Sequence, residues 1–119
     1  MTQYLGVDII EISRIETAVA RWGDAFLDRV YTPAEKDKYR HRPESLAARF
    51  AAKEAVVKAL GIRELVYRDI EIVSEPGDRP EIRLCGRARS IATDIGIGEL
   101  AVSLSHSRDY AVAMVSALS

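Results

Sequence analysis

The spacing of apolar residues along the chain predicts five strands and four helices. The strands are expected at Tyr4–Ile12, Val66–Val73, Glu81–Cys85, Leu100–Ser105 and Tyr110–Leu118, and the helices at about Ser13–Trp22, Pro33–Arg40, Leu46–Leu60 and Arg87–Ile95. The last two strands are separated only by a short polar turn, which predicts a hairpin. Because strands and helices are grouped rather than strictly alternating, the pattern favours an α+β fold, with a mainly antiparallel sheet packed against a long central helix.

Residues that cap helices predict several of the helix ends. In the spacing S-x-x-E, the serine and glutamate side chains each accept a hydrogen bond from the backbone N–H of the other residue. This spacing occurs at Ser13–Glu16, and its threonine form occurs at Thr32–Glu35. Ser45 is expected to cap the long helix and Gly61 to end it. The apolar stretch AFLDRVY, residues 25–31, is expected to be a short piece between the first two helices.

Length and composition narrow the class of protein. A chain of 119 residues is expected to form one domain, 1–119, that is too small to enclose a large cavity by itself. Its 48% hydrophobic and 29% charged residues exclude disorder and a membrane span. A net charge of −1 gives no overall attraction to nucleic acid or a membrane, so neither is expected as a partner. The single Cys85 cannot form an internal disulfide and no secretion signal is visible, so a cytoplasmic location is expected.

Acidic and basic residues break the apolar pattern at two places. Asp8 lies in a strand that its neighbours predict to be buried, where a carboxylate requires Arg, Lys or a metal ion. A buried salt bridge or a strand-end cap is an equally good explanation. Glu54 and Lys58 lie one turn apart beside the apolar arc of the long helix, and the alanines around them are expected to leave space for a ligand. Taken alone, these two residues are better explained as an ordinary exposed ion pair.

Other polar residues leave further alternatives open. Arg49 and Lys53 project within or beside the same apolar arc, so either their aliphatic stems cover it or this side meets something polar, such as a partner subunit. The hydroxyls and imidazole of Ser105–Ser107 can bind phosphate oxygens or simply satisfy a turn. A Ser–His–Asp triad is a poor explanation, because adjacent strand residues point to opposite faces. Arg14 and Arg21 form a small basic stripe, which alone indicates only a solvated face.

Three segments, taken in order, resemble a known family. They are GVDIIEISRIE at Gly6–Glu16, RFAAKEAVVKALG at Arg49–Gly61 and VSLSHSRDYAVAMV at Val102–Val115. The TPAE run at Thr32–Glu35 and DIEI at Asp69–Ile72 also fit. Over nearly its whole length the chain is similar to the holo-acyl-carrier-protein synthases, a small group of 4′-phosphopantetheinyl transferases.

The resemblance implies an activity and an assembly. Enzymes of this family move the phosphopantetheine arm of coenzyme A to a serine of an apo acyl carrier protein and release adenosine 3′,5′-bisphosphate. The carrier belongs to fatty-acid or polyketide synthesis, and the residues do not distinguish these. The small members of the family are homotrimers with sites between subunits. A shared site would also answer the size problem, because a second subunit supplies the missing walls.

The resemblance also implies roles for particular residues. Asp8 and Glu54 would hold Mg²⁺, with Mn²⁺ not excluded, and Asp8, Glu54 and Lys58 together would form the catalytic group. Either Glu54 or a water on the metal ion would take the proton of the attacking serine. Arg14 and Arg21 would face the acidic carrier protein. Coenzyme A would be contacted by Lys58, Gly61, Arg42, Ser105, His106 and Ser107, with Arg40 and His41 as further candidates.

One segment departs from the family. A glycine-rich stretch usually follows the long helix, whereas here Gly61 is followed by Ile62–Leu65 and the next strand is expected early, so the loop is shortened. Contacts of that loop to coenzyme A therefore do not carry over directly. Two other functions remain open on the residues: a metal-dependent hydrolase of the coenzyme A pyrophosphate, and a coenzyme A-binding module without transfer activity.

Overall fold

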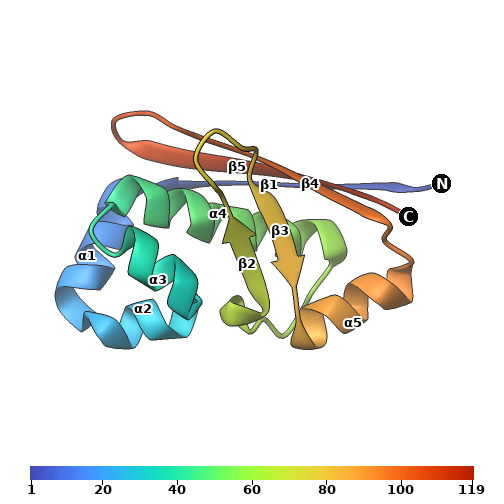
Figure 1. Ribbon diagram of the computed structural model, residues 1–119, viewed down its shortest axis with the longest axis horizontal. Coiled ribbons are helices and arrows are strands. Elements are labelled where there is room, and N and C mark those ends of the chain that lie inside the picture. Colours follow the sequence, from blue (N-terminus) through green and yellow to red (C-terminus); the bar gives the residue numbers. More distant parts are fainter.

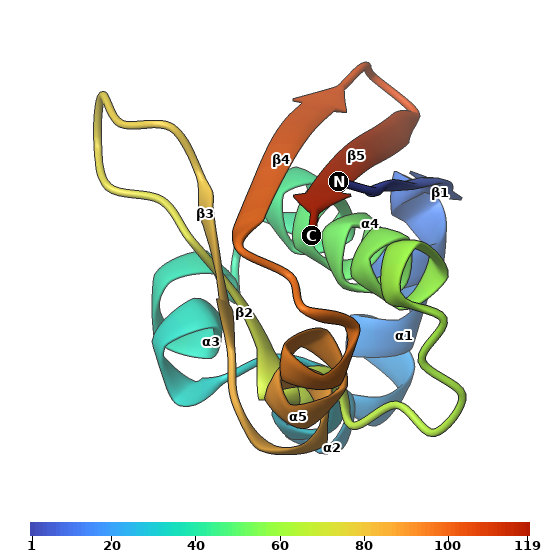
Figure 2. The ribbon, with the colours of Figure 1, turned by 90° about the vertical axis from the view of Figure 1, so that its right-hand side faces the viewer.

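A three-stranded antiparallel sheet lies along one side of the longest helix (Figures 1 and 2). The structure is a computed structural model that describes residues 1–119. Its strands β1 (Gln3–Glu11), β5 (Tyr110–Leu118) and β4 (Glu99–His106) stand in the order β1-β5-β4, and α4 (Pro43–Leu60) packs against their inner face. The α+β fold and its antiparallel sheet on a long helix are confirmed, as is the hairpin of β4 and β5.

The remaining elements surround α4. They are α1 (Ile12–Trp22), α2 (Asp24–Val30), α3 (Pro33–Tyr39), the 3₁₀ turn Tyr67–Asp69, β2 (Ile70–Val73), β3 (Glu81–Leu84) and α5 (Gly86–Ile95). The first three helices gather at one end of the molecule, on the left in Figure 1. β2 and β3 form a separate antiparallel pair, in which β2 contacts α4 and β3 contacts β4. None of the helices combines the length and the apolar character needed to cross a membrane.

Small residues allow α4 to lie close against the sheet. Ala47, Ala51 and Ala55 of α4 are fully buried, and so are the alanines of β5, which stand at alternate positions on its inner face. A Cβ atom on Gly6 of β1 would lie 1.9 Å from the carbonyl oxygen of Ala55, so only glycine fits at this crossing. The expectation that these alanines leave space for a ligand is wrong, because the strands occupy that space.

The outer face of the sheet is apolar and uncovered in the single chain. Successive residues of β1 point to opposite faces, and Leu5, Val7 and Ile9 on the outer face are 63%, 54% and 63% exposed. Met114 of β5, which pairs with Val7, is also exposed. The prediction that the strand around Asp8 is buried is therefore wrong for this chain alone, because α4 covers only one of the two faces.

Local capping explains two of the predicted helix ends. The side chain of Thr32 accepts the N–H of Glu35, and the carboxylate of Glu35 accepts the N–H of Thr32, so this capping box is confirmed. Gly61 ends α4 in the left-handed conformation, at φ +68°, as expected. Ser45 does not cap α4, because the helix begins earlier at Pro43, whose ring suits the first helical position.

Two other local predictions are wrong, and the short piece at residues 25–31, for which no secondary structure was predicted, is mostly helical. The capping box at Ser13 is absent, because α1 begins at Ile12, whose N–H is satisfied by the carbonyl oxygen of Asp109 in the distant hairpin turn. Residues 25–31 lie mostly in a helix, α2, which a sharp turn at Gly23, with φ +55°, separates from α1. The strand expected from Val66 begins only at Ile70, so it does not arrive early after α4.

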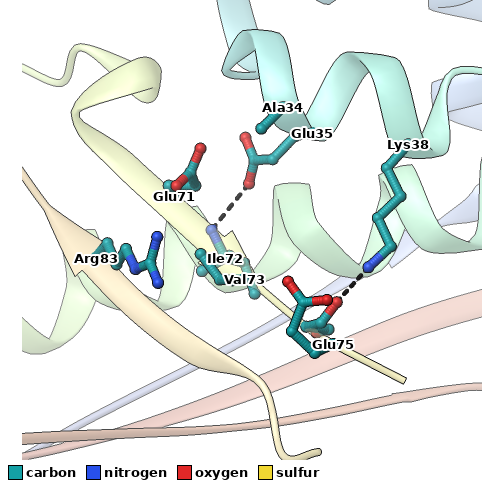
Figure 3. A pocket seen from close by; sticks show the side chains of 9 residues that line it. Ala34, Glu35, Lys38, Glu71, Ile72, Val73, Glu75 and Arg83 are labelled. Atoms are coloured by element: carbon teal, nitrogen blue, oxygen red, sulfur yellow. Dashed lines mark hydrogen bonds between the residues drawn. The ribbon is translucent and has the colours of Figure 1, made fainter.

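A buried ion pair ties α4 to α3 and β2. Nζ of Lys53 donates to Oε1 of Glu35 at 2.7 Å and to the carbonyl oxygens of Ile70 and Tyr67 at 2.6 and 3.2 Å. Oε2 of Glu35 accepts the N–H of Ile72, the bond drawn towards β2 in Figure 3. Burial lowers the pKa of Lys53, and the Glu35 carboxylate opposes this shift.

The terminal nitrogens of Arg49 are bonded inside the chain, whereas its buried Nε has no partner. Its guanidinium donates to the hydroxyls of Tyr39 and Ser74 at 2.8 and 3.0 Å and lies 3.7 Å above the Tyr39 ring. The alternative that this side of the helix meets something polar is therefore confirmed for Arg49 and Lys53. The polar groups belong to the same chain rather than to a partner subunit.

Candidate active site

Asp8 and Lys58 meet where β1 packs against the second half of α4. Nζ of Lys58 donates to Oδ1 of Asp8 at 2.9 Å and to the carbonyl oxygen of Val7 at 3.0 Å. The Asp8 side chain is 18% exposed and that of Lys58 is 54% exposed. The fold thus supplies the cation that Asp8 requires, from another element, and leaves the pair accessible from one side.

Glu54 binds a residue that did not stand out in the sequence. The hydroxyl of Tyr67 donates to Oε1 of Glu54 at 2.6 Å. The Tyr67 ring stacks on Phe50, one turn earlier on α4, with 5.5 Å between ring centroids. The expected pair between Glu54 and Lys58 is not formed, because each has another partner. The available signal for Tyr67 was an aromatic residue on the polar side of the predicted strand 66–73.

The charges at the site act on the Tyr67 phenol. Burial raises the pKa of Tyr67 to about 12, and the hydrogen bond and charge of Glu54 and the charge of Asp8 add to the rise. The charge of Arg29 opposes this rise. At neutral pH the Tyr67 hydroxyl is therefore protonated and donates a hydrogen bond to Glu54.

The donor set fits a magnesium ion that is held partly by its substrate. Asp8 and Glu54 each engage one carboxylate oxygen in a hydrogen bond, while Oδ2 and Oε2 have none. No group of three or more His, Cys, Asp or Glu side chains is placed to hold a metal ion. Because Mg²⁺ commonly takes one or two carboxylates together with phosphates and waters, two carboxylates are enough when a phosphate-bearing ligand completes the shell.

The residues at the hairpin tip lie away from the two carboxylates. Ser105 and Ile9 both pair with Val112 of β5, from opposite sides. The backbone of Ser105 is therefore two strand spacings, about 10 Å, from that of Ile9. Ser105 lies on the outer face, whereas Asp8 lies on the inner one. Ser105 and His106 are exposed and form no side-chain hydrogen bond, while the Ser107 hydroxyl bonds to the backbone of Tyr110 in the turn. His106 pairs with the buried Ala111 and so lies on the inner face, but none of the three side chains is bonded to Lys58.

The other expected coenzyme A contacts lie at opposite ends of α4. Gly61 follows Lys58 by less than one turn. Arg42 precedes the first residue of the helix, and with a rise of about 1.5 Å per residue it lies roughly 24 Å from Lys58 along the axis. Arg42 and Lys58 of one chain therefore do not share a site. Arg40 is paired with Asp24 at 2.9 Å.

Arg14 and Arg21 are exposed on α1, beside an apolar groove. The groove has a volume of about 430 Å³ and is lined by Arg14, Trp22, Phe26 and Phe50 among others. The guanidinium of Arg21 lies 4.9 Å from the centre of the Trp22 ring. Because Phe50 also stacks on Tyr67, the groove leads from the basic stripe towards Glu54.

Several hollows of the chain lie away from the catalytic candidates. Five of them are lined by none of Asp8, Glu54 and Lys58. The hollow in Figure 3, of about 180 Å³, lies between α3 and the β2–β3 pair, where Lys38 donates to the carbonyl oxygen of Ser74.

Comparison with known proteins places the chain in a family. The family model described as "4'-phosphopantetheinyl transferase superfamily" matches residues 4–115. A holo-[acyl-carrier-protein] synthase of Dehalococcoides mccartyi is 52% identical over 115 residues, which cover 96% of this chain and 97% of that protein. One of Moorella thermoacetica is 54% identical and covers 92% of this chain and 88% of its own.

Solved structures agree with this assignment. The Helicobacter pylori holo-[acyl-carrier-protein] synthase in complex with coenzyme A matches with a TM-score of 0.85 and 34% identity, over 96% of this chain and 99% of that one. The Neisseria meningitidis holo-[acyl-carrier-protein] synthase has a TM-score of 0.85 and 36% identity over 98% of both chains. The chain thus belongs to the 4′-phosphopantetheinyl transferase superfamily, within its group of holo-[acyl-carrier-protein] synthases, and is an enzyme of that class.

Proposed function

We propose that this enzyme transfers the 4′-phosphopantetheine group of coenzyme A to a serine of an apo acyl carrier protein, with Mg²⁺ as cofactor. The serine oxygen bonds to the phosphorus next to pantetheine, and the serine proton would pass to Glu54 or to a water. The bond from that phosphorus to the bridging oxygen breaks, and adenosine 3′,5′-bisphosphate leaves. The observation that carries the proposal is the contact between Lys58 and Asp8, with Glu54 one turn before Lys58 on α4, in a chain 52% identical to a protein named holo-[acyl-carrier-protein] synthase.

Three residues, Asp8, Glu54 and Lys58, each have a role in this proposal. Asp8 and Glu54 hold Mg²⁺ through their free oxygens, and the ion neutralises charge on the coenzyme A pyrophosphate when bound. The Lys58 ammonium, half exposed beside Asp8, binds the pyrophosphate and stabilises the charge that grows on the leaving phosphate. Phosphoryl transfer depends mainly on such positioning and charge neutralisation, so the site needs no covalent nucleophile.

The mass of the carrier protein tests the proposal. The enzyme is incubated with coenzyme A, Mg²⁺ and apo carrier, and the carrier is weighed by mass spectrometry. A gain of one phosphopantetheine per carrier is expected. Nucleotide release without a change in carrier mass would indicate hydrolysis instead, and the absence of both would leave only coenzyme A binding; either result contradicts the proposal.

We further propose a homotrimer with its sites between subunits. The apolar outer face of the sheet next to Asp8 is uncovered, and its burial would favour association by about 25 cal/mol per Å². The Lys58 side chain is half exposed beside Asp8. Ser105–Ser107 and Arg42 are not neighbours of Lys58 in one chain, and a neighbouring chain would bring its own copies of these residues to the same coenzyme A.

Val7→Asp is expected to separate the trimer into single chains. Val7 is 54% exposed in the middle of the outer face, and burying an unpaired carboxylate there costs several kcal/mol in each interface. Light scattering should show a mass falling to that of one chain, 13.2 kDa. Val66→Asp is the matched control, because Val66 is 56% exposed but lies off this face. A wild-type monomer, or an unchanged mass for Val7→Asp, would contradict the assembly.

Arg14→Ala is expected to raise the KM for the carrier protein by about five- to tenfold, equivalent to about 1 kcal/mol, and to affect coenzyme A less. Arg14 lines the apolar groove that leads to Glu54, where an acidic carrier would dock. The loss should shrink at high salt, because exposed charges are screened. Arg79→Ala, on the exposed β2–β3 loop, serves as the control. Equal losses for both substrates would indicate that Arg14 is structural.

A further inference from the structure

Tyr67 is held at three points between α4 and β2. Its ring stacks on Phe50 with an angle of 26° between the planes, and its carbonyl oxygen accepts a hydrogen bond from the buried ammonium of Lys53. Its hydroxyl reaches Oε1 of Glu54 at 2.6 Å. Backbone, ring and hydroxyl are thus each fixed by a different residue of α4, so the hydroxyl has a defined position.

Glu54 has no other anchor. Its side chain is half-buried and forms no ion pair, and the bond from Tyr67 is its only side-chain hydrogen bond. A glutamate side chain has several rotatable bonds, and ordering it costs about 1.5–2 kcal/mol of conformational entropy. Because Tyr67 holds Oε1 and leaves Oε2 free, part of that ordering is already complete before a metal ion arrives.

We propose that Tyr67 is a positioning residue, whose hydroxyl orients the Glu54 carboxylate for a divalent cation. This inference rests on the proposed function, in which Glu54 is a metal ligand. Carboxylates that bind metal ions are commonly held by such hydrogen bonds, and losing the outer partner typically lowers metal affinity about 10- to 100-fold. Tyr67 touches neither the ion nor the substrate in this role, and it acts only through Glu54.

Tyr67→Phe tests the inference, because it removes the hydroxyl and keeps the ring on Phe50 and the carbonyl on Lys53. Mn²⁺ is titrated into enzyme with coenzyme A, and free Mn²⁺ is followed by electron paramagnetic resonance, with coenzyme A alone as the blank. The Kd for Mn²⁺ should rise about 10- to 100-fold. The Mg²⁺ concentration that gives half-maximal transfer should rise in parallel, while the KM for the carrier stays the same.

Tyr31→Phe is the matched control. The Tyr31 hydroxyl is buried and donates to the carbonyl oxygen of Leu46 at 2.7 Å, so its loss should lower stability without changing Mn²⁺ binding. A wild-type Kd for Mn²⁺ in Tyr67→Phe, or equal effects in both variants, would overturn the inference even if wild-type enzyme modifies the carrier. Wild-type enzyme that binds Mn²⁺ but leaves the carrier unmodified would contradict the proposed function instead. Wild-type enzyme that binds no Mn²⁺ would overturn both.

Discussion

Glu54→Gln is expected to lower the rate of phosphopantetheine transfer about 10²–10³-fold while the fold persists. Glutamine has the same size, and its amide oxygen can still accept the hydrogen bond that Tyr67 donates to Oε1 at 2.6 Å. The substitution therefore removes only the negative charge, which a divalent cation requires. The mass gain of the carrier, measured over time at fixed Mg²⁺ and coenzyme A, gives the rate.

Glu44→Gln is the matched control for this prediction. Glu44 lies in the first turn of α4 and takes part in no salt bridge. Its replacement makes the same chemical change on the same helix, and transfer should remain close to that of the wild type. A wild-type rate of transfer in Glu54→Gln would show that Glu54 is not a ligand of the metal ion. Equal losses in both variants would assign the effect to the overall charge of the helix.

Lys53→Met is expected to lower the free energy of unfolding by about 3–5 kcal/mol. Methionine keeps the length and shape of the side chain, but Glu35 then remains as a buried charge without its cation. The Lys53 and Glu35 side chains are 0% and 2% exposed, so water does not replace the lost contact. Urea denaturation followed by circular dichroism measures the change.

Two further variants separate the pair from the methionine itself. Combining Lys53→Met with Glu35→Gln removes both charges and should recover a large part of the loss. Lys58→Met makes the same change five residues later, where the side chain is 54% exposed, and should alter stability by less than about 1 kcal/mol. The loss of unfolding free energy in the double variant is compared with the sum of the losses in Lys53→Met and in Glu35→Gln. If the two are equal, the charges are not coupled.

Local patterns predicted the elements that depend on neighbouring residues. The capping box at Thr32–Glu35, the glycine end of α4 and the β4–β5 hairpin are each determined within a few residues, and all are confirmed. The start of α1 was missed because its acceptor lies on Asp109, far along the chain. The strand start at Ile70 was missed because the turn before it is held by Lys53 from α4.

The sequence by itself determined the family, the class of fold and which residue types are available for chemistry, among them Asp8, Glu54 and Lys58. Only the tertiary structure decided which of them touch. Helical spacing reveals only neighbours within α4 and so suggested a Glu54–Lys58 pair, whereas Lys58 binds Asp8 and Glu54 binds Tyr67. The first contact depends on how closely β1 approaches α4, which Gly6 allows against Ala55, and the second on the turn before β2, which Lys53 holds against α4. No one-dimensional spacing records such distances.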